Sequence, residues 1–206
     1  MNHLLNEEQF PAGFLPAWFE ARRRHALEQA EQLPEPSRHM ESWRFGAPGN
    51  ESLEHVEAAP PAAPETLAPI IRERASMPEA LRIVYANGLP VSIPEELPEG
   101  LSVMDMEDFV LQCPDTARKY LETETETLGS EKLSALATAF QHNGLVIMAD
   151  REISLPLEIL HFISGDNVAV FPSTLLIAKT GSRLRILERH NSADLGRKFS
   201  GALQQY

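Results

Sequence analysis

The side chains best suited to proton transfer or metal binding are seven histidines and one cysteine, and they are scattered along the chain. The histidines are His3, His25, His39, His55, His142, His161 and His190. None has another histidine two, three or four positions away, the spacings that place two ligands on one face of a strand or helix. Sequence spacing alone therefore predicts no histidine metal site.

His161 falls in a predicted strand at the same alternate positions as Leu157 and Ile159, so we expect it to face the core. We interpret it as a buried, hydrogen-bonded histidine, because no second histidine, cysteine or carboxylate lies beside it at ligand spacing. The carboxylates available in the same β-rich part are Glu158 and Glu188, and they lack the spacing of a cupin site.

Motifs for nucleophilic catalysis and phosphate binding are absent from the sequence. It contains no phosphate loop, no Gly-x-Gly-x-x-Gly and no Gly-x-Ser-x-Gly elbow. Cys113 precedes Pro114 at the predicted C-terminus of a helix, the wrong end of the helix dipole to favour a thiolate. We therefore predict no catalytic, cofactor-binding or metal-binding residue, and no enzymatic activity of the chain by itself.

Composition and charge narrow the classes of function. Of the 206 residues, 43% are hydrophobic, which is enough for a packed core, and the formal net charge of -12 argues against a general nucleic-acid footprint. A single cysteine excludes an intrachain disulfide. No run approaches the roughly 18 apolar residues of a membrane span, and the N-terminus lacks signal-peptide features. We expect a cytoplasmic protein that binds neither nucleic acid nor membranes.

The hydrophobic period changes from helical to strand-like within residues 135–150. A helical stripe ends at Phe140, and His142-Asn-Gly144 reads as a turn in which Asn and Gly adopt positive φ. Further short strands are predicted over residues 145–148, 157–163, 168–171, 175–178 and 184–188. Such closely spaced short strands favour a sandwich, a barrel or a β-solenoid. Residues 191–206 are polar and weakly periodic, and they contain no strong cap for a β-solenoid.

The first part of the chain, residues 1–140, is predicted to be a mainly helical region. Its helices are expected over residues 3–33 and 115–140, with Arg22-Arg-Arg24 on a solvated face. A Pro-rich connector is predicted over residues 46–69, with a short helix opening near its end. Residues 81–93 predict a β-hairpin around Asn87-Gly88, and Asp105 is expected to cap the next helix.

Six segments, in order, resemble the SufB/SufD family of iron–sulfur cluster assembly proteins, more closely its SufD branch. They are Arg38-His-Met-Glu-Ser-Trp-Arg-Phe45, Ile83-Val-Tyr-Ala-Asn-Gly-Leu-Pro90, Leu97-Pro-Glu-Gly-Leu-Ser-Val103, Leu136-Ala-Thr-Ala-Phe-Gln-His-Asn-Gly-Leu-Val-Ile147, Pro156-Leu-Glu-Ile-Leu160 and Ser182-Arg-Leu-Arg-Ile-Leu-Glu-Arg189. The resemblance covers residues 38 to 190.

This resemblance implies an α+β, mainly β fold: a helical N-terminal region over residues 1–140, then a right-handed parallel β-helix, here shortened to its first rungs over residues 141–206. It implies a non-catalytic scaffold or accessory role in a SufBCD complex, with SufB-like and SufC-like partners. A homodimer through the β-helix edge is a further possibility. An iron–sulfur cluster is expected only in the assembled complex, because the family's later rungs, its SufC-binding C-terminal domain and its late Cys and His positions have no counterpart here.

Two other interpretations remain open from the sequence. One is a small-molecule-binding β domain or sugar-active enzyme of the cupin or β-helix type, which would need histidines and carboxylates clustered inside the β region. The other is a fragment, or a shortened product that has lost the family's function. The sequence does not choose between a fragment and a natural short form.

Overall fold

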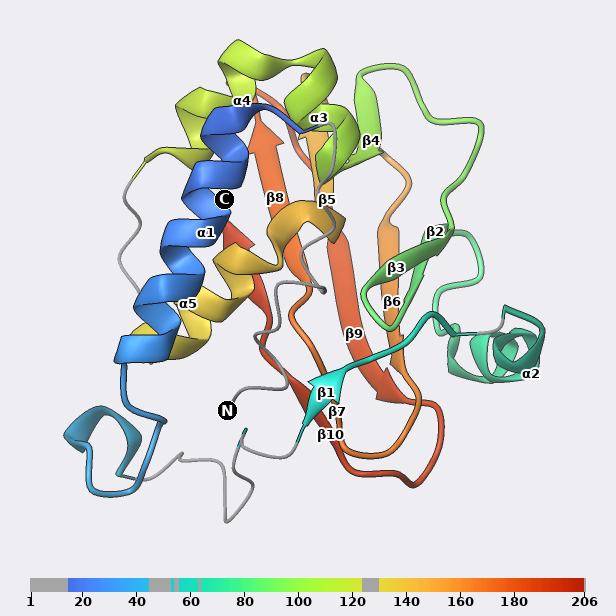
Figure 1. Ribbon diagram of the computed structural model, residues 1–206. Coiled ribbons are helices and arrows are strands. Elements are labelled where there is room, and N and C mark those ends of the chain that lie inside the picture. Colours follow the sequence, from blue (N-terminus) through green and yellow to red (C-terminus); the bar gives the residue numbers. More distant parts are fainter. Residues whose placement is uncertain (1–14, 45–52, 54–55, 63, 124–129, 206) are drawn as a thin grey trace.

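Two sheets packed face to face form the centre of the protein in a computed structural model that describes residues 15–44, 53, 56–62, 64–123 and 130–205 (Figure 1). The helices are α1 (Ala17–Gln32), α2 (Pro64–Arg74), α3 (Met106–Gln112), α4 (Pro114–Leu121) and α5 (Glu131–Ala139), with short 3-10 helices η2 (Glu41–Trp43) and η4 (Gln141–Asn143). The strands are β1 (Glu57–Ala58), β2 (Leu81–Ala86), β3 (Leu89–Ser92), β4 (Leu101–Asp105), β5 (Leu145–Ala149), β6 (Leu157–Ile163), β7 (Val168–Val170), β8 (Ser173–Ala178), β9 (Ile186–Ser192), β10 (Lys198–Ser200) and β11 (Leu203–Gln205).

From β5 onward, each strand pairs with the strand three places later in the chain rather than with its sequence neighbour. β5 pairs in parallel with β8, β6 with β9, β7 with β10, and β8 with β11. Every pairing joins residues about 30 positions apart, as in Leu145 with Thr174 and Leu157 with Ile186. We call the sets β5–β6–β7 and β8–β9–β10 the first and second coil. The second coil lies alongside the first, strand for strand.

Strands from the first 140 residues cover the opposite edge of the first coil. β2 pairs in parallel with β6 and turns back into β3, β4 pairs antiparallel with β5, and β1 pairs in parallel with β7. The predicted hairpin is confirmed, and Asn87 and Gly88 have φ of +50° and +80° at its turn. Each of the three sheets therefore contains strands from before and after residue 140, where the sequence predicted a domain boundary.

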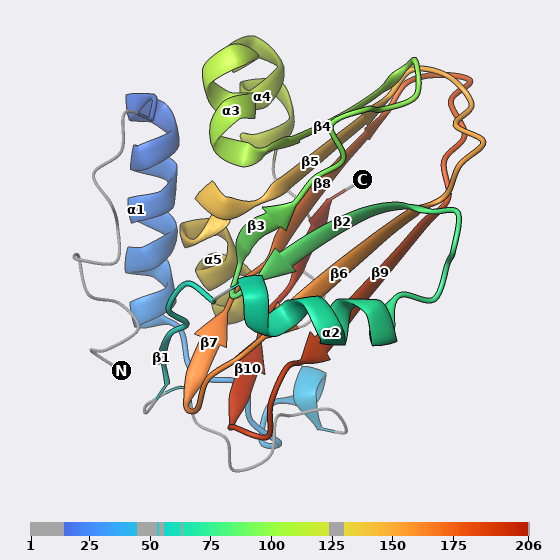
Figure 2. The ribbon, with the colours of Figure 1, turned by 90° about the vertical axis from the view of Figure 1, so that its right-hand side faces the viewer.

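Helices cover the outer faces of the two larger sheets (Figure 2). Outward side chains of β5 and β8, such as Val146 and Leu175, pack with Phe19 of α1 and Phe109 of α3. On the other sheet, Leu160 and its neighbours pack with α2. Between the sheets lies an apolar interior, formed by Ile83, Tyr85, Leu101, Leu145, Ile147, Ala149, Ile153, Leu157 and Ile159. Because strand side chains alternate, one set fills this interior and the other set binds the helices.

The predicted change from helix to strand is confirmed at the junction between α5 and β5. Gly144, at this junction, has a different role from the one expected. Ser130 caps α5 by accepting a hydrogen bond from the Leu133 amide. Gly144 has φ of −68°, so no left-handed conformation is needed there. A side chain at Gly144 would instead approach the Gln141 carbonyl oxygen at 2.9 Å and the Ser173 carbonyl oxygen at 3.1 Å. Glycine is required at this position because a larger side chain would clash with these two carbonyl oxygens.

Two segments contain strands that the sequence did not indicate. Residues 191–206 carry no predicted strand, but β9 extends to Ser192 and β10 and β11 follow. Their polar side chains hide the strand period, because these strands pair with β7 and β8 at the edge of their sheets. The connector predicted over 46–69 contains the short strand β1, which was not expected, whereas the short helix expected to open near its end is confirmed as α2. The right-handed β-helix stays a prediction. No helix in the described ranges combines the length and apolar character needed to cross a bilayer.

Close stacking of the two coils predicts the effect of Gly196→Ala. A methyl group at Gly196 would lie 2.2 Å from the carbonyl oxygen of Gly165, which turns the chain one coil earlier. The three atoms nearest to this methyl group, in Gly165 and Asp166, all belong to the backbone. We therefore expect the free energy of unfolding to fall by about 1–3 kcal/mol in urea titration. The exposed neighbour Leu195 provides the control, because Leu195→Ala removes a side chain without contacts to lose. Equal stability of the two variants would contradict the stacking.

Candidate functional site

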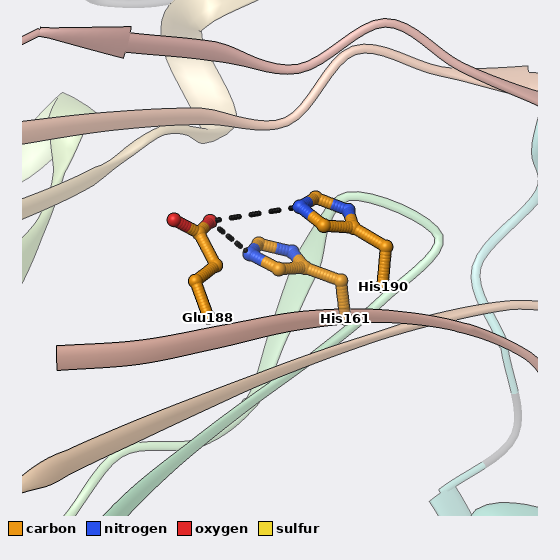
Figure 3. A group of neighbouring side chains, drawn as sticks. All are labelled: His161, Glu188 and His190. Carbon is orange, nitrogen blue, oxygen red and sulfur yellow. Dashed lines mark hydrogen bonds and ion pairs between the residues drawn. The ribbon is translucent and has the colours of Figure 1, made fainter.

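His161 of the first coil converges with Glu188 and His190 of the second coil, although His161 comes much earlier in the sequence (Figure 3). Parallel pairing of β6 with β9 places His161 opposite His190 and Ile159 opposite Glu188. Glu188 and His190 are two positions apart on β9, so both point to the same face as His161. The pairing register of β6 with β9 therefore brings these side chains together, which the spacing of residues within a single strand could not indicate.

Possible ligand atoms of the three side chains lie close to one another. His161 Nε2 is 2.8 Å from Glu188 Oε1, and His190 Nε2 is 3.9 Å from the same oxygen. The imidazole rings of His161 and His190 are stacked, with centroids 4.5 Å apart and planes inclined by 5°. One possible ligand atom from each residue lies within 4.8 Å of the other two.

Glu188 is held from the opposite sheet. The Thr174 hydroxyl of β8 donates to Oε1 at 3.1 Å, and the Gln204 amide of β11 donates to Oε2. Burial by itself raises the pKa of the Glu188 carboxyl, but the hydrogen bond and charge of His161 and the Thr174 bond outweigh it, so the pKa is lowered. The carboxylate is therefore anionic at neutral pH and points toward both imidazoles.

The two histidines differ in their access to solvent. The His161 side chain is 5% exposed, whereas the His190 side chain is 31% exposed. The His161 ring packs against the buried Tyr85 ring, with the two ring centroids 5.5 Å apart. Burial and the neighbouring His161 lower the pKa of His190, and Glu188 opposes this shift. His190 is thus the member of the cluster that can meet a solute and change its rotamer.

The outcome for the sequence-based predictions is mixed. His161 is buried and hydrogen-bonded, as predicted, but the argument that no second histidine or carboxylate lies beside it was wrong. Glu158 lies on the other face of β6, where Ser76 and Arg82 bind it. Glu188 is one of the two carboxylates that the sequence offers for such a cluster, but the sequence-based prediction missed His190 as a neighbour of His161. The sequence did contain a signal for this neighbour: positions 161 and 190 are separated by about 30 residues, the length of one coil, and residues one coil apart lie side by side on paired strands.

The remaining predicted candidates do not join this cluster. Cys113 ends α3 and also begins α4, so it lies at both a C-terminus and an N-terminus rather than only the former. His25 and His39 are exposed on the surface. His3 and His55 lie outside the described residues.

A second polar cluster joins α1 to the start of the first coil. Arg23 is fully buried and donates from Nε to the Ala139 carbonyl at 2.9 Å, from Nη1 to Glu20 at 2.8 Å and from Nη2 toward His142 Nδ1 at 3.0 Å. Burial lowers the pKa of Arg23, while Glu20 raises it. The expected solvated face at Arg22-Arg-Arg24 was therefore wrong for Arg23. All three donor groups bind atoms of this chain, which indicates a structural role.

His142 is neutral in this second cluster. A guanidinium has only donors, so the Nδ1 atom that faces Arg23 must carry the lone pair. Burial and the charge of Arg23 lower the pKa of His142 to about 4, and a backbone hydrogen bond with Phe140 opposes them. This histidine is therefore committed to the fold and unavailable as a surface ligand.

Comparison with known proteins gives one line of similarity. No family model matches the chain. The iron–sulfur cluster assembly protein SufD of Bacillus subtilis (strain 168) is 24% identical over 187 residues, which cover 86% of this chain and 42% of that protein. The chain thus spans less than half the length of the relative it matches. This similarity supports a distant relationship to SufB/SufD-like proteins.

Proposed function

We propose that the chain is a SufD-like scaffold or accessory component of iron–sulfur cluster assembly, without catalysis of its own. The observation that carries the proposal is the match to an iron–sulfur cluster assembly protein over 86% of this chain. The six family-like segments fall within residues 38 to 190, so the resemblance in motifs and the overall match concern the same region. A cluster would be held by the assembled complex rather than by this chain.

The arrangement of strands is compatible with this proposal. A parallel β-helix requires successive coils that pair strand on strand in the same register, and β5 to β11 follow that order. We propose that these coils are the first rungs of a right-handed β-helix. The outer edges of β9, β10 and β11 have no paired strand among the described residues. Unpaired strand edges are templates for association.

We propose that the chain binds a SufB-like partner, and that a SufC-like subunit joins through it. The test is capture of the tagged chain from its own cells under reducing, anaerobic conditions. SufB-like and SufC-like proteins should be enriched with the tagged chain relative to a tag-only control. Their absence, with the tagged chain recovered intact, would contradict the proposal. Recovery of only a second copy of the chain would favour a homodimer instead.

A second candidate function is a free-standing small-molecule-binding β domain of the cupin or β-helix type. One observation favours it: His161, Glu188 and His190 form the cluster of histidines and a carboxylate that such a domain needs. This alternative predicts a chain that stays alone in the same capture experiment. It also predicts binding of a small polar solute that is lost when His190 is replaced.

A further inference from the structure

The space between the two large sheets changes from apolar to polar between the first and second coils. Leu145 of β5 is paired with Thr174 of β8, and Ile159 of β6 is paired with Glu188 of β9. An apolar residue of the first coil is thus replaced by a polar one at the equivalent position of the second coil. Gln204 of β11 extends the row that contains Thr174. A carboxylate at a position equivalent to isoleucine is costly unless its charge is compensated. The compensating groups here are two imidazoles, a hydroxyl and an amide.

The ligand types suit a divalent transition-metal ion. Two imidazole nitrogens and one carboxylate oxygen form the set found in three-ligand zinc sites and in the facial triad of non-haem iron. Magnesium and calcium prefer all-oxygen sites, so the imidazoles select against them. Cys113, the chain's only thiol, lies elsewhere, between α3 and α4. The set therefore favours ions such as Zn²⁺, Co²⁺ or Fe²⁺.

The distances also fit such an ion after a small rearrangement. With bonds of about 2.1 Å, an ion holds its ligand atoms about 3.0–3.4 Å apart. The separations of 2.8 Å and 3.9 Å from Glu188 Oε1 to the two imidazole nitrogens lie on either side of this range. The stacked rings must rotate so that both Nε2 lone pairs meet at one point. His190 can make most of this movement because its side chain is the most exposed of the three.

Support around the ligands is already in place. Thr174 and Gln204 hold both oxygens of Glu188, and β6 and β9 hold the backbones of the histidines in register. Hydrogen-bonded carboxylate ligands of this kind are typical of metal sites, where outer partners orient the inner ones. Three protein ligands leave one or more coordination positions open for water or a small anion.

We propose that His161, Glu188 and His190 bind one divalent transition-metal ion where β6 of the first coil pairs with β9 of the second. The ion takes Nε2 of each histidine and Oε1 of Glu188. It bridges the first and second coils, and water or a small anion completes its coordination. This site is independent of the proposed scaffold function, because it depends on the cluster and not on any partner.

The test is titration of the full chain, freed of metal by a chelator, with Co²⁺ and then Zn²⁺. We expect Co²⁺ to bind at one equivalent with the ligand-field absorption of a low-coordinate site, and Zn²⁺ to displace it. His190→Ala and Glu188→Gln should each weaken binding at least about tenfold. His190→Ala is the safer variant, because His190 is the exposed member and its loss leaves the core intact.

His25→Ala and His39→Ala are the matched controls, because both remove an exposed histidine far from the cluster in sequence. They should bind Co²⁺ as the unmodified chain does, and circular dichroism should show the same fold for all variants. No one-equivalent binding by the unmodified chain would overturn the inference. Unchanged binding by folded His190→Ala would overturn it too. Capture of SufB-like and SufC-like partners is a separate readout, so either idea can fail alone.

Discussion

Arg23→Ala is expected to lower the free energy of unfolding by about 3–5 kcal/mol. Arg23 is fully buried, and its guanidinium joins α1 to the carbonyl of Ala139, to Glu20 and to His142. Truncation leaves a cavity and removes the donors of three partners, one of them a carboxylate. A buried acceptor that loses its donor keeps its full desolvation penalty. Urea unfolding followed by circular dichroism measures the loss.

Arg24 supplies the matched control for Arg23. It belongs to the same turn of α1 and carries the same charge, but its side chain is exposed. Arg24→Ala should change the free energy of unfolding by no more than about 0.5 kcal/mol. Arg23→Met, which keeps the apolar stem, should recover part of the loss. If Arg23→Ala and Arg24→Ala were equally stable, the polar cluster would not contribute to the fold.

Stability should fall as the pH drops from neutral to about 4, and His142 should account for up to about 3 kcal/mol of that fall. The pKa of His142 is lowered from 6.5 to about 4 by burial and by Arg23. Well above pH 6.5 the histidine is neutral in both states and contributes no pH dependence. Between these values the unfolded chain takes up a proton that the folded chain does not, so unfolding becomes more favourable.

His142→Gln isolates this contribution from that of the many carboxylates. A glutamine oxygen can still accept the Arg23 hydrogen bond but does not titrate. The difference in unfolding free energy between pH 7 and about pH 4 should therefore be smaller in the variant, by about 3 kcal/mol at most. Parallel stability profiles for the two proteins would mean that His142 titrates normally in the fold. An NMR titration of the histidine ring protons would report the same pKa directly.

Local signals predicted much of the fold. The hairpin at Asn87-Gly88, the cap at Asp105 and the helix-to-strand change before Leu145 depend on residues close in sequence, and all three are confirmed. Such features follow from turn geometry, capping and period. The partner of each strand does not follow from them, because it lies about 30 residues away.

The candidate site could be predicted only in part for the same reason. The alternation in β6 placed His161 inside, but it could not place His190 beside it without the register of β6 on β9. Arg23 was misjudged because the charged run at Arg22-Arg-Arg24 looks the same whether one member is buried or none is. Its burial depends on Ala139 and His142, which are more than 100 residues away. Polar residues in β10 and β11 likewise hid two strands.

The most direct test of the proposed scaffold function uses purified components. Sedimentation velocity of the chain mixed with the SufB-like subunit of the same cell, under reducing and anaerobic conditions, measures whether they associate. The proposal predicts one species heavier than either protein, with equal amounts of both chains, and no iron–sulfur chemistry by this chain alone. Two species that sediment independently at all concentrations would contradict it.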